Sequence, residues 1–253
     1  MTALLEARGI CVSFDGVQAL QEVNITVGTG ELVGLIGPNG AGKTTLLHVI
    51  AGIINPQRGD VFLDRRSLTG LSTDRRVLMG LGISRQLVRP FYSMSVRENV
   101  ELAAGAAGMR NPLTALVRRN SRAERRQSAR ILALVGLEAF ADKHPGDLPL
   151  GMRKRLEMAK CLAHKPRLLL LDEPLAGLPQ TEARALADTI ARLQNERSGI
   201  VVIEHNLGEV LRICSRMVVM DNGRCPKTGA PERVMADARV RAAYLGEGHA
   251  GTG

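Results

Sequence analysis

The stretch Gly37-Pro38-Asn39-Gly40-Ala41-Gly42-Lys43-Thr44 decides the fold of this chain. It fits the pattern G-x-x-x-x-G-K-[ST], follows the apolar run ELVGLI at residues 31–36 and precedes a stretch of helical composition at residues 44–53. In such a strand, loop and helix, the glycines let successive backbone N–H groups turn inward around phosphates, and the helix adds its positive N-terminal end. The sequence therefore predicts a nucleotide site, with the Lys43 ammonium on the β and γ phosphates and the Thr44 hydroxyl on Mg²⁺.

A second motif follows downstream, where the aliphatic run Leu168–Leu171 ends in Asp172 and Glu173. Strands that are buried on both faces of a sheet are continuously aliphatic, and ligands bind at the carboxyl ends of such strands. Asp172 is predicted to hold Mg²⁺ through a water, and Glu173 to orient and polarise an attacking water. Taken alone, the two acids could also be helix-capping residues; after the glycine loop, the interpretation as phosphoryl-transfer groups is favoured.

The remaining pattern predicts an α/β fold with a mostly parallel sheet. Alternating β segments before residue 30 predict an antiparallel β part, and strands alternate with helices after Pro166. We expect a hairpin turn at Asp221-Asn222-Gly223 and a terminal helix over Pro231–Leu245. Residues 1–253 are expected to form one domain, with a nucleotide-binding core at 1–90 and 161–253, including the antiparallel β part, and an inserted helical subdomain at 91–160.

The composition excludes several other classes of protein. The chain has 253 residues, 45% hydrophobic and 23% charged, which is typical of a globular protein. No apolar run approaches the ~20 residues that a membrane span needs, and MTALLEARGICVSF lacks the layout of a secretory signal, so we expect a cytosolic chain. The four cysteines lie too far apart for a zinc or redox motif. The absence of Trp, with two Tyr and four Phe, argues against a base-stacking surface for nucleic acid.

With both motifs in place, the chain resembles the ATP-binding-cassette ATPases over nearly its whole length. The resemblance implies ATP and Mg²⁺ as cofactors. It also implies that Phe14 stacks on adenine, that Gln86 links the Mg²⁺ site to a partner subunit, and that His205 contacts the γ-phosphate. The expected nucleotide-binding residues are Phe14, Gly37, Pro38, Asn39, Gly40, Ala41, Gly42, Lys43, Thr44 and Thr45; the expected metal-site residues are Thr44, Gln86 and Asp172; the expected catalytic residues are Glu173, His205 and Gln86.

The signature segment departs from the family. It reads Leu148-Pro149-Leu150-Gly151-Met152 in place of Leu-Ser-Gly-Gly-Gln, so the serine and glutamine donors are absent, and Pro149 has no N–H. The lost serine removes a charge-assisted hydrogen bond to phosphate, worth about 1.5–3 kcal/mol. Pro179 also stands where many members have Asp. In this family the signature completes the nucleotide site of the partner subunit, so we expect a heterodimer with a second, different cassette, in which this chain's own site turns over.

Several short segments resemble the ATPase subunits of branched-chain amino acid importers and their urea- and amide-uptake relatives. These are residues 86–99, 155–159, 176–178, 203–205 and 241–246. The resemblance implies membrane permease subunits, indirectly a periplasmic binding protein, and a peripheral position on the cytoplasmic face of the membrane. The alternative is a soluble, ATP-switched regulatory protein with weak hydrolysis, including one associated with DNA.

The net charge of +9 is concentrated in one region. Residues 85–155 hold 14 Lys or Arg and 6 Asp or Glu, a net charge of +8. Within residues 118–130, a helix would place Arg118, Arg122, Arg126 and Arg130 on one face. This face is interpreted either as solvated or as a docking surface for anionic lipid or an acidic permease loop; a nucleic-acid partner is not expected.

Overall fold

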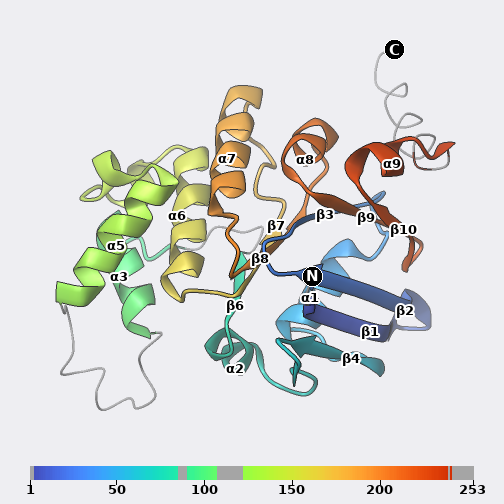
Figure 1. The fold of residues 1–253 in the computed structure, drawn as a ribbon. Coiled ribbons are helices and arrows are strands. Elements are labelled where there is room, and N and C mark those ends of the chain that lie inside the picture. Colours follow the sequence, from blue (N-terminus) through green and yellow to red (C-terminus); the bar gives the residue numbers. More distant parts are fainter. Residues whose placement is uncertain (1–2, 85–89, 107–121, 239, 241–253) are drawn as a thin grey trace.

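The computed structural model of the chain describes residues 3–84, 90–106, 122–238 and 240, and these residues contain two sheets (Figure 1). The first has the order β2-β1-β4-β5 and is antiparallel: β1 (Ala3–Phe14), β2 (Val17–Gly28), β4 (Arg58–Leu63) and β5 (Arg66–Ser67). The second has the order β10-β9-β3-β8-β7-β6: β3 (Leu32–Ile36), β6 (Leu81–Ser84), β7 (Leu168–Asp172), β8 (Gly199–Ile203), β9 (Arg216–Asp221) and β10 (Arg224–Gly229). Its strands are parallel except β10, which confirms the predicted fold class.

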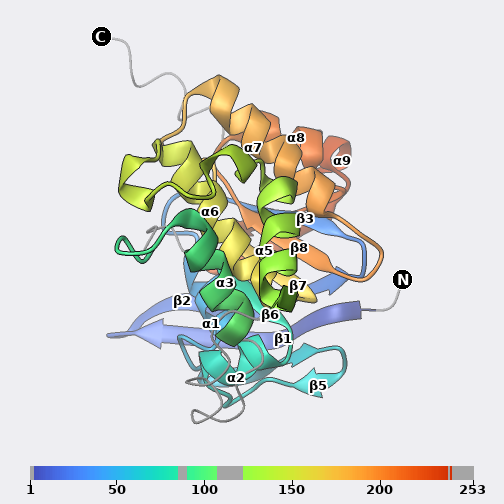
Figure 2. The ribbon, with the colours of Figure 1, turned by 90° about the vertical axis from the view of Figure 1, so that its left-hand side faces the viewer.

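The helices form two groups around the six-stranded sheet. Figure 2 shows α3, α5 and α6 packed together beyond the β6 edge, as the inserted helical part. In Figure 1, α7 and α8 lie above the sheet, and α1 and the antiparallel sheet lie below it. The bounds are α1 (Lys43–Ala51), α2 (Thr73–Leu78), α3 (Val96–Ala106), α5 (Arg122–Val135), α6 (Leu150–Ala163), α7 (Gln180–Leu193), α8 (Leu207–Ile213) and α9 (Pro231–Met235), with 3₁₀ turns at Glu138–Phe140 and Pro145–Asp147.

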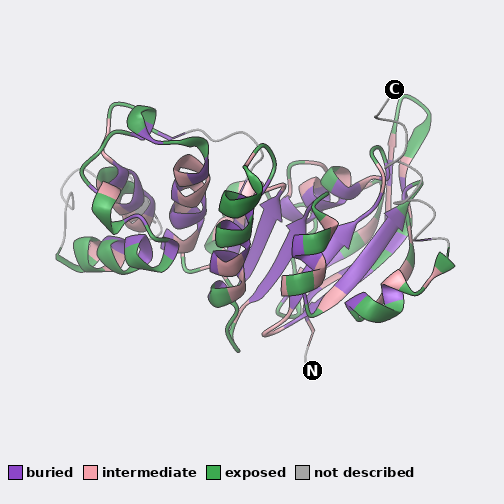
Figure 3. Cartoon of the chain, turned by 90° about the horizontal axis from the view of Figure 1, so that it is seen from above, coloured by how far each residue is buried: buried purple, intermediate pink, exposed green. Residues whose placement is uncertain are grey.

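The central strands are buried on both faces, which explains their continuous aliphatic sequences. Every residue of β3, β7 and β8 is buried (Figure 3). Because side chains alternate along a strand, Leu169 and Leu171 enter the core that contains α6 and α7, whereas Leu168 and Leu170 enter the core that contains α1 and the antiparallel sheet. The two cores hold the parallel strands rigidly, and so hold the loops at their carboxyl ends.

Two local predictions have different outcomes. The predicted hairpin is confirmed: Asp221 pairs with Arg224, and Asn222 and Gly223 have φ values of 45° and 73°, as a two-residue hairpin turn requires. The single terminal helix over Pro231–Leu245 is wrong, because α9 ends at Met235 and Asp237 leaves the helix, its carboxylate 2.8 Å from the Lys227 ammonium on β10. Residues 241–245 lie outside the described residues.

The predicted limits of the helical subdomain stay a prediction. Helix α6 runs without a break through the proposed boundary between residues 160 and 161.

Among the helices of the described residues, none is long and apolar enough to cross a membrane.

Candidate functional site

The order of the strands brings the predicted site residues to one edge of the sheet. Strand β8 pairs in parallel with both β3 and β7, so the loops after these three strands open on the same side. The glycine loop follows β3, Asp172 and Glu173 lie at the end of β7, and His205 lies two residues after β8. Segments that are 130 residues apart in sequence can therefore act on one ligand.

The glycine loop forms a tight curve that leads into α1. Gly42 has φ of 98°, and a Cβ atom there would lie 2.6 Å from the carbonyl oxygen of Ala19, so only glycine fits without strain. The Lys43 ammonium is buried and donates to the carbonyl oxygens of Gly37 and Pro38, at 2.7 and 2.9 Å. Helix α1 has no side-chain cap and no acidic residue in its first turn. Its N-terminal N–H groups and the ammonium are thus placed to bind an anion.

Asp172 has the properties of a metal ligand. Its side chain is only 6% exposed, and its Oδ1 atom has no hydrogen-bond partner among the described residues. Burial, reinforced by the neighbouring Glu173, raises the pKa of Asp172 to about 6, while the charges of Lys43 and His205 oppose the rise. A buried carboxylate oxygen without a partner suits Mg²⁺, which binds through oxygen ligands. Asp172 and the exposed Thr44 hydroxyl would hold this ion together. The positive charge of the ion would balance the negative charge of the phosphates.

Glu173 and His205 face each other. Glu173 Oε1 lies 3.1 Å from His205 Nε2. Glu173 has φ of 48°, which is unusual for a residue with a side chain, and its N–H donates to the Ile203 carbonyl at 3.0 Å. Backbone strain of this kind is common at functional sites.

Two further side chains that the sequence analysis did not single out support this pair. Glu204 is 3% exposed, and it accepts the N–H of Leu175 on Oε1 at 2.5 Å and that of His205 on Oε2 at 3.2 Å. Burial raises the pKa of Glu204, and these hydrogen bonds oppose the rise. Lys154 of α6 donates to the carbonyl oxygen of Glu173 at 3.1 Å. Glu204 could have been identified from the sequence, because it is an acidic residue directly after the aliphatic strand β8. No sequence pattern marks Lys154.

The remaining predicted residues are distributed as follows. Phe14 ends β1 and is 47% exposed, so its ring is open to stacking. Gln86 lies outside the described residues. In the signature segment, Leu148 and Gly151 are buried, Pro149 precedes the first residue of α6, and Leu150 is exposed at the start of that helix.

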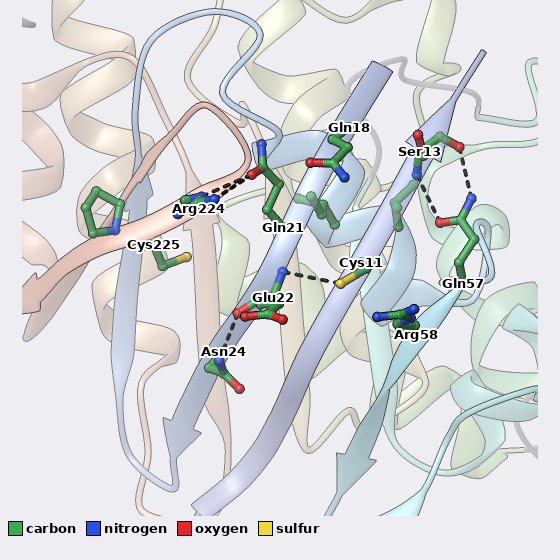
Figure 4. Close-up of a pocket in the computed structure, with 13 residues that line it drawn as sticks. Cys11, Ser13, Gln18, Gln21, Glu22, Asn24, Gln57, Arg58, Arg224 and Cys225 are labelled. Carbon is green, nitrogen blue, oxygen red and sulfur yellow. Dashed lines mark hydrogen bonds between the residues drawn. The ribbon is translucent and has the colours of Figure 1, made fainter. Parts of the chain in front are cut away.

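A polar hollow of about 890 Å³ lies elsewhere, against β1, β2 and β10 (Figure 4). Cys11, Glu22, Arg58 and Arg224 are among the residues that line it. None of the residues expected at the nucleotide is among those that line this hollow.

The strand–glycine loop–helix unit, the acidic strand end and the helical insertion define an ATP-hydrolysing cassette. Residues 20–176 match the family described as "ABC transporter", and residues 228–250 match one described as "Branched-chain amino acid ATP-binding cassette transporter". The chain belongs to the ABC transporter family and is an ATP-binding, ATP-hydrolysing member of it, as the sequence predicted.

Relatives match along the whole chain. The lipopolysaccharide export system ATP-binding protein LptB of Acidithiobacillus ferridurans is 35% identical, covering 98% of each chain. The high-affinity branched-chain amino acid transport ATP-binding protein BraF of Pseudomonas aeruginosa is 36% identical, covering 96% of this chain and 98% of the relative. The solved ADP conformation of an ATP-binding cassette of an ABC transporter matches with a TM-score of 0.85 and 27% identity, covering 97% of this chain and 100% of that one.

Proposed function

We propose that this chain is the ATP-hydrolysing subunit of an importer for branched-chain amino acids or a related small polar solute. The observation that carries the proposal is the match of residues 228–250 to the branched-chain amino acid cassette family. The similarity to BraF supports it. LptB, named for export of lipopolysaccharide, is about as similar, so the shared cassette by itself does not distinguish the solutes. That choice would be made by the permease and the binding protein.

The proposed reaction is hydrolysis of ATP, in which water attacks the γ-phosphorus and ADP departs. The Lys43 ammonium and the N–H groups of the glycine loop bind the phosphates, and Phe14 stacks on adenine. The Glu173 carboxylate orients the attacking water and accepts its proton, while His205, 3.1 Å from that carboxylate, contacts the γ-phosphate. Mg²⁺ held by Asp172 and Thr44 would neutralise charge on the phosphate oxygens.

The altered signature favours a partner cassette of different sequence. At the start of α6, Pro149 has no N–H, and Leu150 presents an aliphatic side chain where the family has glycine. The Glu182 carboxylate lies so near Gly151 that a Cβ atom there would meet Oε2 at 2.5 Å, and a carboxylate repels phosphate. Two copies of this chain would therefore form two weak composite sites, whereas a partner with an intact signature would complete this chain's own site.

Besides the contact with a partner cassette, the chain has an apolar surface on which a permease could dock. An apolar hollow of about 380 Å³ lies between β6, α3 and α6, and Phe91 and Leu102 are among the residues that line it. Phe91 is 51% exposed and the adjacent Tyr92 is 54% exposed. Grouped exposed apolar side chains mark contact surfaces, and ABC ATPases work with membrane permeases, so we assign this hollow to permease docking.

Basic side chains of the helical part follow one face of α5. Arg122, Arg126 and Arg130 are exposed at intervals of four residues, while Arg118 lies outside the described residues. We propose that these arginines contact anionic lipid headgroups and so hold the chain peripherally at the membrane.

The test of this function is an ATPase assay over a range of chain concentrations, alone and with the second cassette that co-purifies with the permeases. The isolated chain is expected to be slow, and the mixture fast and coupled to uptake of labelled leucine in reconstituted vesicles. Full activity of the isolated chain, rising with the square of its concentration, would refute the heterodimer. Active, permease-bound complexes that take up no branched-chain amino acid would refute the substrate.

A further inference from the structure

The catalytic pair is held by a contact from the signature helix. The Nζ atom of Lys154, one turn into α6, donates to the carbonyl oxygen of Glu173 at 3.1 Å. The same carbonyl accepts the N–H of Ala176 at 3.2 Å. Burial lowers the pKa of Lys154, and the charges of Glu204 and Glu173 oppose this change. Lys154 thus fixes the peptide group that carries the Glu173 side chain, at a residue whose φ of 48° is strained.

Helix α6 contacts the loop after β7 at a second point. Gly151, three residues before Lys154 and so on the same side of the helix, packs on Leu178 and Glu182, and Leu150 packs on Gly177. The loop from Glu173 to Leu178 is therefore held at both ends by one turn of α6. That turn begins within the signature segment, Leu148–Met152, which in this family faces the nucleotide of the partner subunit, and it ends at Lys154, two residues beyond that segment.

Glu204 extends the same connection to the next loop. Its buried carboxylate joins the N–H of Leu175, after β7, to the N–H of His205, after β8. A displacement of the Glu173 loop would therefore also displace His205 relative to the Glu173 carboxylate. The distance of 3.1 Å between Glu173 Oε1 and His205 Nε2 depends on both restraints.

We propose that Lys154 is a positioning residue for ATP hydrolysis: it links the signature helix to the main chain of Glu173 and sets the geometry of the Glu173–His205 pair. Lys154 acts through the main chain of Glu173. It gives the signature segment, which serves the partner's nucleotide, a direct connection to the catalytic carboxylate of its own subunit. Hydrolysis at one site would then respond to occupancy of the other through one side chain. The proposal on Lys154 rests on the proposed function as an ATPase. The hydrolysis rate of the wild-type chain in the same assay tests that function separately.

The test compares Lys154→Met, which keeps the aliphatic stem and removes the donor, with Lys154→Arg, which keeps charge and donors. The matched control is Lys165→Met, at an exposed lysine just beyond the end of α6. In the full chain mixed with its partner cassette, Lys154→Met is expected to lower kcat about 10- to 100-fold, because a displacement of about 1 Å has such effects. The KM for ATP should stay within about twofold of wild type. Lys154→Arg should recover most of kcat, and Lys165→Met should match wild type.

A second measurement separates positioning from mere support of the fold. In a Glu173→Gln background, Lys154→Met should cause no further loss of hydrolysis, because both changes act through the same carboxylate. The proposal is overturned if Lys154→Met leaves kcat within twofold of wild type. It is also overturned if Lys154→Met and Lys154→Arg both lower the fraction of protein that binds ATP by the same factor as the activity. A third contradicting result is that Lys154→Met lowers the hydrolysis rate by the same factor in the wild-type and in the Glu173→Gln background.

Discussion

The substitution Asp172→Asn tests whether the metal-site carboxylate is held in the folded chain at an energetic cost. Asp172 is almost fully buried, its Oδ1 atom has no hydrogen-bond partner among the described residues, and burial raises its pKa from 3.8 to about 6. At about 1.4 kcal/mol per pKa unit, this shift corresponds to about 3 kcal/mol. Because the pKa is higher in the folded state, the contribution of Asp172 to stability is complete below pH 3.8 and is lost as the pH rises through about 6.

The assay is urea unfolding of both chains between about pH 4 and pH 7.5, without nucleotide and with divalent ions removed by a chelator. Between about pH 4 and pH 7.5 the free energy of unfolding of the variant should rise by about 2 kcal/mol relative to that of wild type, since the asparagine amide that replaces the carboxylate has no charge to bury. Asp221→Asn, at the exposed end of strand β9 in the same sheet, serves as the control and should follow wild type. The same pH dependence in wild type and Asp172→Asn would refute the reasoning.

Three further changes test other parts of the account. Arg76 is fully buried and donates to the carbonyls of Val49 and Ile50 at the end of α1, so Arg76→Leu should lower the free energy of unfolding by about 3 kcal/mol in urea titrations; a loss below about 1 kcal/mol would contradict this. Gly42→Ala should weaken ATP binding more than about tenfold in a fluorescence titration, because φ of 98° and the Ala19 carbonyl oppose a Cβ atom there; unchanged affinity would show that the loop adapts. Replacing the exposed arginines of α5 with glutamine should weaken binding to anionic vesicles at low salt about 100-fold, at about 1 kcal/mol per charge. Binding to neutral vesicles should stay unchanged. If the wild type and the variant bind anionic vesicles equally, the arginines form a face that is only solvated. The arginines to be replaced are Arg122, Arg126 and Arg130.

The central fold could be predicted because its signals are local. The run Leu168–Leu171 is aliphatic throughout because alternate side chains enter two different cores. The glycine loop needs glycine where the backbone turns to positive φ, and this requirement is visible in a stretch of eight residues. Since both motifs end parallel strands, their meeting at one edge of the sheet followed from the fold class.

The contacts that hold the catalytic pair could not be predicted in the same way. Lys154 donates to a main-chain carbonyl 19 residues away, and Glu204 accepts an N–H from a residue 29 positions earlier. Neither contact leaves a periodic pattern, because each joins one side chain to a backbone group. The end of α9 at Met235 could not be predicted from helical composition either, because Asp237, just beyond the helix, makes a tertiary contact with Lys227 on β10.

The most direct test of the central claim is the ATPase rate of Glu173→Gln beside wild type, each mixed with the same partner cassette. If Glu173 orients and deprotonates the attacking water at this chain's own site, the variant should bind ATP as wild type does and lose at least about 100-fold in kcat. A variant that binds ATP normally and hydrolyses it at the wild-type rate would contradict the assignment of Glu173 and the proposal that this chain's own site turns over.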